Sequence, residues 1–211
     1  RRLNEMKKIS LLIITLTTFA SAQLRVGLDL NGGIDYSIMG IGVDYKSKLG
    51  LRVGYEKTLF GIAGVGAEYV MTQLGDAEMT VSGNLFGEKI SESETISDKV
   101  FPNVLMGYGI ARVPLGVPFA RAIVRAGMFI PMGTTTIDGE GIKWSEQFEP
   151  GLAWGIGVRA KLPLIPIGSE LLYQSMKLTS KEGEPSEDDD DSTFMYEGNF
   201  SSFTLVATYS F

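Results

Sequence analysis

The sequence contains no cysteine and no histidine among its 211 residues. Without cysteine it forms no disulfides, so its stability must come from closure of its own sheet and from its surroundings. Without histidine it lacks the side chain whose pKa near neutrality makes it the usual general base. A carboxylate pair could take that role, but Glu140, Glu146 and Glu149 share one polar segment and are expected to be solvated. We therefore expect no enzyme and no cofactor.

The sequence also lacks a run of the about 20 apolar residues that a membrane-spanning helix needs. The strongest apolar run, residues 9–19, follows Met6-Lys7-Lys8 and precedes Ala20-Ser21-Ala22. A basic start, a short apolar core and a small-x-small cleavage site are the marks of a secretory signal peptide. We expect residues 1–22 to be upstream residues plus a cleaved signal peptide, and residues 23–211 to be the mature chain.

Acidic residues outnumber basic ones, with 25 Asp and Glu against 19 Lys and Arg and a net charge of −6. Loss of residues 1–22 removes four basic residues and one acidic residue, which takes the mature chain to −9. An acidic chain is poorly suited to nucleic acid, so we expect no such partner. The 44% apolar content at this length favours one compact domain.

What the sequence does contain is a repeated alternation with a period of two, which is typical of β-strands. Between residues 151 and 162 apolar residues alternate with small or charged ones, and the same pattern occurs at 24–31, 49–56 and 63–69. The polar face of a soluble sheet seldom carries so much glycine. One apolar face and one small or charged face suit a barrel with lipid outside and a narrow lumen inside.

Turn signals divide the mature chain into about ten strands, with eight as the alternative. The expected strands are 24–35, 38–45, 49–57, 62–72, 77–85, 100–112, 118–130, 150–162, 167–178 and 200–211. Short connections at 46–48, 74–76, 114–117 and 163–166 fall on one side, and long polar segments at 86–99, 131–149 and 179–199 fall on the other. Short periplasmic turns and long outer loops are typical of outer-membrane barrels. The predicted fold is an all-β, closed antiparallel up-and-down transmembrane barrel with both ends in the periplasm.

The last expected strand alternates Phe203, Leu205, Ala207, Tyr209 and Phe211 with Thr, Val and Ser. This pattern resembles the C-terminal signature of outer-membrane β-barrel proteins, in which a final aromatic residue closes an amphipathic strand. The mature chain as a whole resembles the small porin-family or OmpA-like barrel domains of Gram-negative bacteria. The resemblance implies a monomer in the outer membrane, surrounded by lipid and lipopolysaccharide, with Phe211 as a signal for the barrel assembly machinery.

Parity along the strands predicts which charged side chains face the lumen. The inward set holds six cations and five anions: Arg25, Asp29, Asp44, Arg52, Glu56, Glu68, Arg121, Arg125, Arg159, Lys161 and Glu170. A charge held away from water is costly unless it is paired, so we expect these side chains to pair across a narrow lumen and plug it. The alternative is a selectivity lining, in which Arg121 and Arg125 attract anions.

Aromatic residues and one acidic run carry two further predictions. Parity directs Tyr69, Tyr108, Trp154, Tyr173 and Tyr209 outward, where some would belong to an interfacial belt. The run from Glu187 to Asp191 offers five carboxylates to Ca²⁺ or Mg²⁺, but it lacks the interleaved glycine and spaced ligands of a calcium loop. We favour a solvated outer loop tip and expect no metal site.

Two functions of different classes fit this sequence. The first is a structural or surface-interaction barrel, plugged by paired charges and exposing long outer loops. The second is a small passive channel for ions or small solutes, which the glycine-lined inner face suggests. Histidine-dependent activities such as those of outer-membrane proteases, phospholipases and lipid A-modifying barrels are not expected.

Overall fold

The computed structural model describes residues 22–38, 41–59, 62–85, 88–133, 135–139, 142–162, 164–180 and 197–211. Among them no helix combines the length and the apolarity that a bilayer crossing requires. The strands are β1 (Ala22–Ile38), β2 (Ile41–Leu59), β3 (Ala63–Met71), β4 (Ala77–Leu85), β5 (Glu88–Ile96), β6 (Asn103–Pro114), β7 (Ala120–Met132), β8 (Thr135–Gly139), β9 (Ile142–Glu146), β10 (Gly151–Lys161), β11 (Ile167–Thr179) and β12 (Glu197–Ser210).

Eight of these strands close into an antiparallel barrel in the order β1, β2, β3, β6, β7, β10, β11 and β12. The ring closes at β1, where Leu28 lies opposite Leu51 of β2 on one side and Leu205 of β12 on the other. The ends of β1 and β12 meet, since the Phe211 amide donates to the Ala22 carbonyl oxygen at 3.1 Å. We call this the terminal end of the barrel. The closed antiparallel barrel predicted from the alternation is confirmed.

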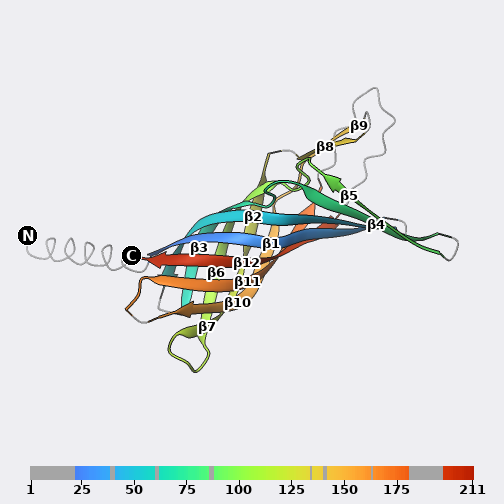
Figure 1. Ribbon diagram of the computed structural model, residues 1–211. Helices are drawn as coiled ribbons and strands as arrows, with labels where there is room; N and C mark the ends of the chain where they lie inside the picture. The colour runs from blue at the N-terminus through green and yellow to red at the C-terminus, as the bar shows by residue number, and fades with distance from the viewer. Residues whose placement is uncertain are drawn as a thin grey trace, which may run out of the picture.

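Two hairpins project beyond the barrel at the opposite end, which we call the hairpin end (Figure 1). Strand β4 pairs with residues 42–47 of β2 and with β5, so this hairpin extends the wall of the barrel. Strands β8 and β9 form a separate two-stranded sheet. The long polar segments 86–99 and 131–149 contribute to these hairpins, so both lie on one side of the barrel as the sequence predicted.

The barrel has eight strands, the stated alternative, and the preferred count of about ten was wrong for a specific reason. Residues 46–48 do not form a turn, because β2 continues through them while paired with β1 and β4. The expected strands 38–45 and 49–57 are therefore largely one long strand. The expected strand 77–85 exists as β4, but it lies outside the closed ring.

Loss of the turn at 46–48 also changes which connections share an end. The segment 74–76 lies at the hairpin end, between β3 and β4, and the connection from β2 to β3 lies at the terminal end instead. The two remaining short connections, 115–119 and 162–166, lie at the terminal end as expected.

Large apolar side chains cover the outer surface of the barrel. They come from all eight strands and include Leu24, Val26, Leu28, Val53, Val65, Leu105, Val124, Trp154, Ile156, Leu171 and Leu205, each between 41% and 53% exposed. Charged and polar side chains fill the inside, with Arg25, Arg52, Glu56 and Glu68 at most 1% exposed. This distribution is the reverse of a water-soluble protein and matches a barrel whose outer face meets lipid.

Candidate functional site

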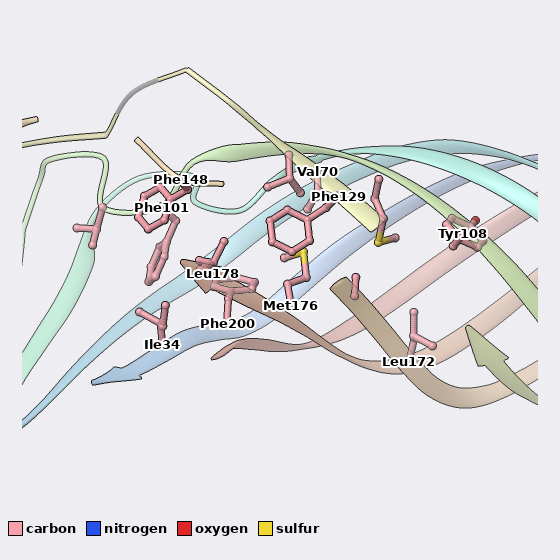
Figure 2. Close-up of a cluster of buried hydrophobic side chains, with 14 of the residues drawn as sticks. Ile34, Val70, Phe101, Tyr108, Phe129, Phe148, Leu172, Met176, Leu178 and Phe200 are labelled. Atoms are coloured by element: carbon pink, nitrogen blue, oxygen red, sulfur yellow. The ribbon is translucent and has the colours of Figure 1, made fainter. Parts of the chain in front are cut away.

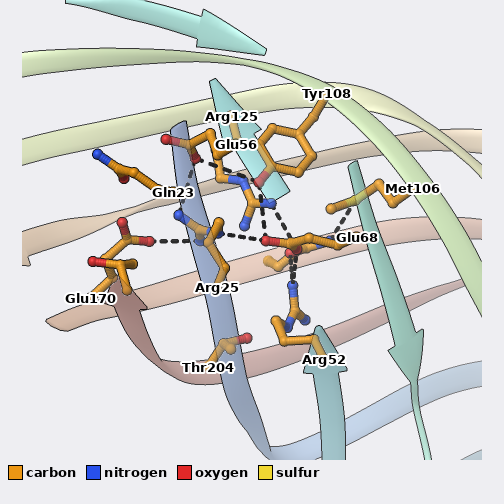
Figure 3. A network of polar contacts seen from close by, with 12 residues as sticks. Gln23, Arg25, Arg52, Glu56, Glu68, Met106, Tyr108, Arg125, Glu170 and Thr204 are labelled. Carbon is orange, nitrogen blue, oxygen red and sulfur yellow. Dashed lines mark hydrogen bonds and ion pairs between the residues drawn. The ribbon is translucent and has the colours of Figure 1, made fainter. Parts of the chain in front are cut away.

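A network of charged side chains occupies the barrel interior (Figure 3). Every barrel strand contributes to it: β1 gives Arg25 and Asp29, β2 Arg52 and Glu56, β3 Glu68, β6 Tyr108 and Arg112, β7 Arg125, β10 Arg159, β11 Glu170 and Gln174, and β12 Thr204. Alternation directs each of these residues inward from its strand. The network therefore connects all eight strands through side chains, in addition to the backbone ladder.

Glu68 lies at the centre of the network. Its carboxylate accepts hydrogen bonds from Arg25 Nε at 2.8 Å and Arg52 Nη1 at 3.1 Å. It also lies 2.7 Å from Arg125 Nη2 and accepts a hydrogen bond from the Tyr108 hydroxyl at 3.1 Å. Three guanidinium groups thus share one fully buried carboxylate, which makes Glu68 the residue whose charge the interior can least do without.

Arg25 and Arg52 form ion pairs with the other buried carboxylates. Arg25 contacts Glu56 through Nη1 at 3.0 Å and Glu170 through Nη2 at 2.6 Å. Arg52 donates hydrogen bonds to both carboxylate oxygens of Asp29, from Nε at 2.8 Å and from Nη2 at 2.7 Å. This bidentate geometry is the strongest between a guanidinium and a carboxylate. All five side chains in these pairs are at most 1% exposed.

Tyr108 belongs to this network, and the prediction that it faces outward was wrong. Its ring is 5% exposed and the Arg125 guanidinium stacks on it, 3.6 Å from the ring centroid. The prediction treated the glycine-bearing face as the inner one, but in β6 it is Gly107 that faces outward while Val104, Met106 and Tyr108 face inward. Trp154 and Tyr209 are exposed as expected, and Tyr69 and Tyr173 are half-buried.

Inward glycines make room for large neighbours and do not line an open lumen. A Cβ on Gly54 would lie 2.2 Å from Cγ of Glu68, its partner across the strand pair. A Cβ on Gly66 would lie 2.5 Å from the Tyr108 hydroxyl, which again belongs to the residue paired with it. The space that a side chain at each glycine would occupy is therefore taken by the buried side chain of the residue opposite.

Gly127 offers a direct test of this packing. A Cβ there would approach the Gly107 carbonyl oxygen to 2.0 Å and the Tyr108 Cα to 2.6 Å, and backbone atoms cannot move aside cheaply. We expect Gly127→Ala to lower the free energy of unfolding by about 1–3 kcal/mol. Gly107→Ala is the matched control, because its Cβ would meet nothing within 4 Å, and it should be nearly neutral. Equal stability of the two variants, measured by urea unfolding in lipid, would contradict the packing described.

Of the other residues expected in the lumen, Arg159 and Glu170 are buried, as are Asp29, Arg52, Glu56 and Arg125. Arg121 is exposed and Lys161 is half-buried, and both lie where the interior opens at the terminal end. Sequence reasoning missed Arg112, which is 4% exposed and pairs with Glu56. The available signal was the cation itself, since a charge within an apolar transmembrane strand belongs on the inner face.

Asp44 does not face the lumen, and the expectation that it would was wrong. Asn31 of β1 has a positive φ of 52°, and the register between β1 and β12 shifts between Leu30 and Gly33. This irregularity exchanges the inner and outer faces, so Ile34 turns inward and Asp35, with its partner Asp44, turns outward. Asp44 pairs with Lys46 at 2.5 Å. A hydrogen bond with Asp44 raises the pKa of Asp35, because one proton shared by two neighbouring carboxyls relieves their repulsion.

An apolar cluster closes the hairpin end of the interior (Figure 2). Val100 and Phe101, from the segment between β5 and β6, are buried against it, and the rings of Phe101 and Phe200 meet edge to face at 5.1 Å. Gln73 holds this segment in place: its side-chain oxygen accepts from the Val100 amide at 2.9 Å, and its nitrogen donates to the Asp98 carbonyl at 2.9 Å. The interior is thus filled by apolar side chains at the hairpin end and by charged side chains between that cluster and the terminal end.

The terminal end is open by comparison. A pocket of about 670 Å³ enters the barrel there, between the connections 115–119 and 162–166. Arg112 and Arg159, which belong to the charged network, form part of its wall. The pocket and the network therefore share these two arginines.

No group of three or more Asp or Glu residues in the described part of the chain is arranged to hold a metal ion. The acidic run from Glu187 to Asp191 lies outside the described residues. Phe211 is 64% exposed and packs edge to face on Tyr209 at 5.2 Å, on the outer surface at the terminal end.

No protein-family model matches the sequence, and no curated protein matches it. Among solved structures, the crystal structure of Neisserial surface protein A is similar over 90% of this chain and 97% of that chain, with a TM-score of 0.54 and 8% sequence identity. The translocator domain of the autotransporter NalP from Neisseria meningitidis matches over 99% of this chain and 96% of that chain, with a TM-score of 0.31 and 11% identity. At 8% identity the first likeness is one of fold. The chain has the fold of a small outer-membrane β-barrel, as its last strand predicted.

Proposed function

We propose that the protein is a non-conducting outer-membrane β-barrel with a structural or surface-interaction role. The observation that carries this proposal is the filled interior. Paired charges from seven strands, joined by Thr204 of β12, lie next to an apolar closure that includes Phe101 and Phe200. A barrel of eight strands has an interior just wide enough for side chains to fill, so little room is left for solute.

Placement in the membrane rests on the apolar outer face and on the predicted signal peptide. The terminal end faces the periplasm in this proposal, because chains delivered from that side leave their ends there and expose their long loops outside. The hairpins β4–β5 and β8–β9 then project from the cell, beside lipopolysaccharide. Export by cleavage after Ala22, recognition of Phe211 by the barrel assembly machinery, and a monomeric state belong to the same proposal.

The passive channel is the weaker alternative. It was suggested by the glycine-lined inner face, but Gly54 and Gly66 accommodate Glu68 and Tyr108. An enzymatic role has as little support, since the buried carboxylates Glu56, Glu68 and Glu170 are each paired with arginine and are poorly placed to exchange protons with a substrate.

The surface role is tested by trimming the hairpin end. Cells that lack the protein are supplied with the full chain, or with a chain in which residues 79–94 of the β4–β5 hairpin are replaced by a short Gly-Ser linker. Leu115→Gln, in the connection 115–119 at the opposite end, is the control, because Leu115 is exposed there. We expect the trimmed protein to remain a heat-modifiable barrel but to lose most attachment of cells to surfaces. Full attachment by the trimmed variant would contradict a role for this hairpin.

A further inference from the structure

The pocket at the terminal end is lined by four cations. Arg112, Arg121, Arg159 and Lys161 all line it, and no Asp or Glu is among its described lining residues. They come from β6, β7 and β10, so three adjacent strands direct positive charge into one recess. Thr58, Ser210 and Gln23 add polar groups to the same wall.

Positive side chains outnumber negative ones in the interior and the pocket. Among the described residues there, seven cations, Arg25, Arg52, Arg112, Arg121, Arg125, Arg159 and Lys161, accompany four carboxylates, Asp29, Glu56, Glu68 and Glu170. Those carboxylates are shared further inside: Glu56 and Glu170 each contact Arg25 as well as a pocket arginine. An arrangement of this kind attracts an external anion.

One donor atom of the pocket arginines also lacks an acceptor. Arg112 is 4% exposed, and its Nε makes no hydrogen bond with any described residue. Buried donors of charged groups are nearly always satisfied in proteins, because an unsatisfied one costs free energy. A ligand oxygen in the pocket would supply the missing acceptor.

The remaining lining is apolar. Phe119, Leu162, Leu164 and Ile165 form it, from the two connections that flank the opening, and all four are exposed. A recess of about 670 Å³ falls within the range of pockets that hold organic ligands, and it is far larger than a bare inorganic anion needs. The chemistry of the lining changes from cationic inside to apolar at the rim.

We propose that this pocket binds a phosphate-bearing amphiphile. Arg112, Arg121, Arg159 and Lys161 would hold the phosphate, and the apolar rim would contact the rest of the molecule. Phosphate fits better than carboxylate because it has more acceptor oxygens and more negative charge to share among several converging cations. The phosphate could belong to a phospholipid headgroup or to a soluble phosphate compound, and the two sources are separated by the choice of probe.

The test uses the full chain refolded in a neutral detergent and isothermal titration calorimetry with three probes. They are dihexanoyl phosphatidic acid, inorganic phosphate, and a neutral diacylglycerol with the same chains. The double variant Arg121→Gln/Lys161→Gln removes the two more accessible cations, and Lys46→Gln/Lys48→Gln makes the same charge change at the hairpin end. Heat-modifiable mobility establishes that every variant is folded.

We expect phosphatidic acid to bind the unmodified protein, and to bind the Arg121→Gln/Lys161→Gln variant roughly tenfold more weakly or worse. The hairpin-end control should bind as the unmodified protein does. Equal affinity for inorganic phosphate would support the site and assign it to a soluble phosphate. Binding of the neutral lipid as tight as that of phosphatidic acid, unchanged affinity in the pocket variant, or no binding of either phosphate probe would each overturn the proposal.

Discussion

Replacing Glu68 by glutamine is expected to lower the free energy of unfolding by about 3–5 kcal/mol. The substitution keeps the size of the side chain but leaves Arg25, Arg52 and Arg125 around a neutral group. Removing one partner of a buried ion pair costs this much because the remaining charge stays away from water without compensation. Urea unfolding of the refolded barrel in lipid vesicles, followed by tryptophan fluorescence and by heat-modifiable mobility, measures the loss.

The control for this substitution is Glu94→Gln, which makes the same chemical change on the exposed strand β5. It should alter stability by less than about 0.5 kcal/mol. A second variant, Glu68→Gln/Arg125→Met, removes one of the stranded charges and should recover part of the loss. Comparable stability of the Glu68→Gln and Glu94→Gln variants would show that the buried network is not what couples the eight strands.

Replacing Phe101 by alanine is expected to open the closure at the hairpin end. The ring is 1% exposed and contacts Phe200, so its removal costs about 3–5 kcal/mol of local packing. The segment between β5 and β6 is also held by the hydrogen bonds of Gln73 and by one from the Thr72 hydroxyl to the Pro102 carbonyl oxygen, which are too few to offset that loss. We expect trypsin to cleave the folded variant after Lys99 at least tenfold faster than it cleaves the unmodified protein.

Leu105→Ala is the matched control for the closure, because Leu105 lies on the neighbouring strand β6 but faces outward and is 45% exposed. Its cleavage after Lys99, identified by mass spectrometry, should not change. If Phe101→Ala is cleaved at the unmodified rate while it remains a heat-modifiable barrel, the segment is anchored by something other than the apolar cluster.

The fold could be predicted because a period of two is a local property of a strand and does not depend on its partners. The alternation between residues 151 and 162 and in the last strand placed β10 and β12 closely. Which face was inner could be inferred only where charge marked it, as for Arg25 in β1 and Arg159 in β10. In β6 parity placed Tyr108 outward, and this was the wrong face, since a tyrosine can be buried beneath a stacked arginine.

The strand count and Asp44 were mispredicted for a related reason. The tract 46–48 looks like a turn because it is polar, yet β2 extends past the apolar outer face, where polar side chains are compatible with a strand. The exchange of faces near Asn31 depends on local backbone geometry, which the alternation pattern does not predict. The one indication in the sequence was the asparagine itself, since this residue type can adopt a positive φ. Pairing across the lumen also depends on strands far apart in sequence, such as β1 with β11.

Conductance of the purified protein in planar lipid bilayers tests the central claim, that the interior is filled. We predict no current steps for correctly folded, heat-modifiable protein. The Phe101→Ala variant should also remain silent, because the arginine and glutamate network around Glu68 still blocks the lumen below the opened closure. Reproducible steps from the unmodified protein, of constant size between preparations, would contradict a plugged barrel and favour the passive channel.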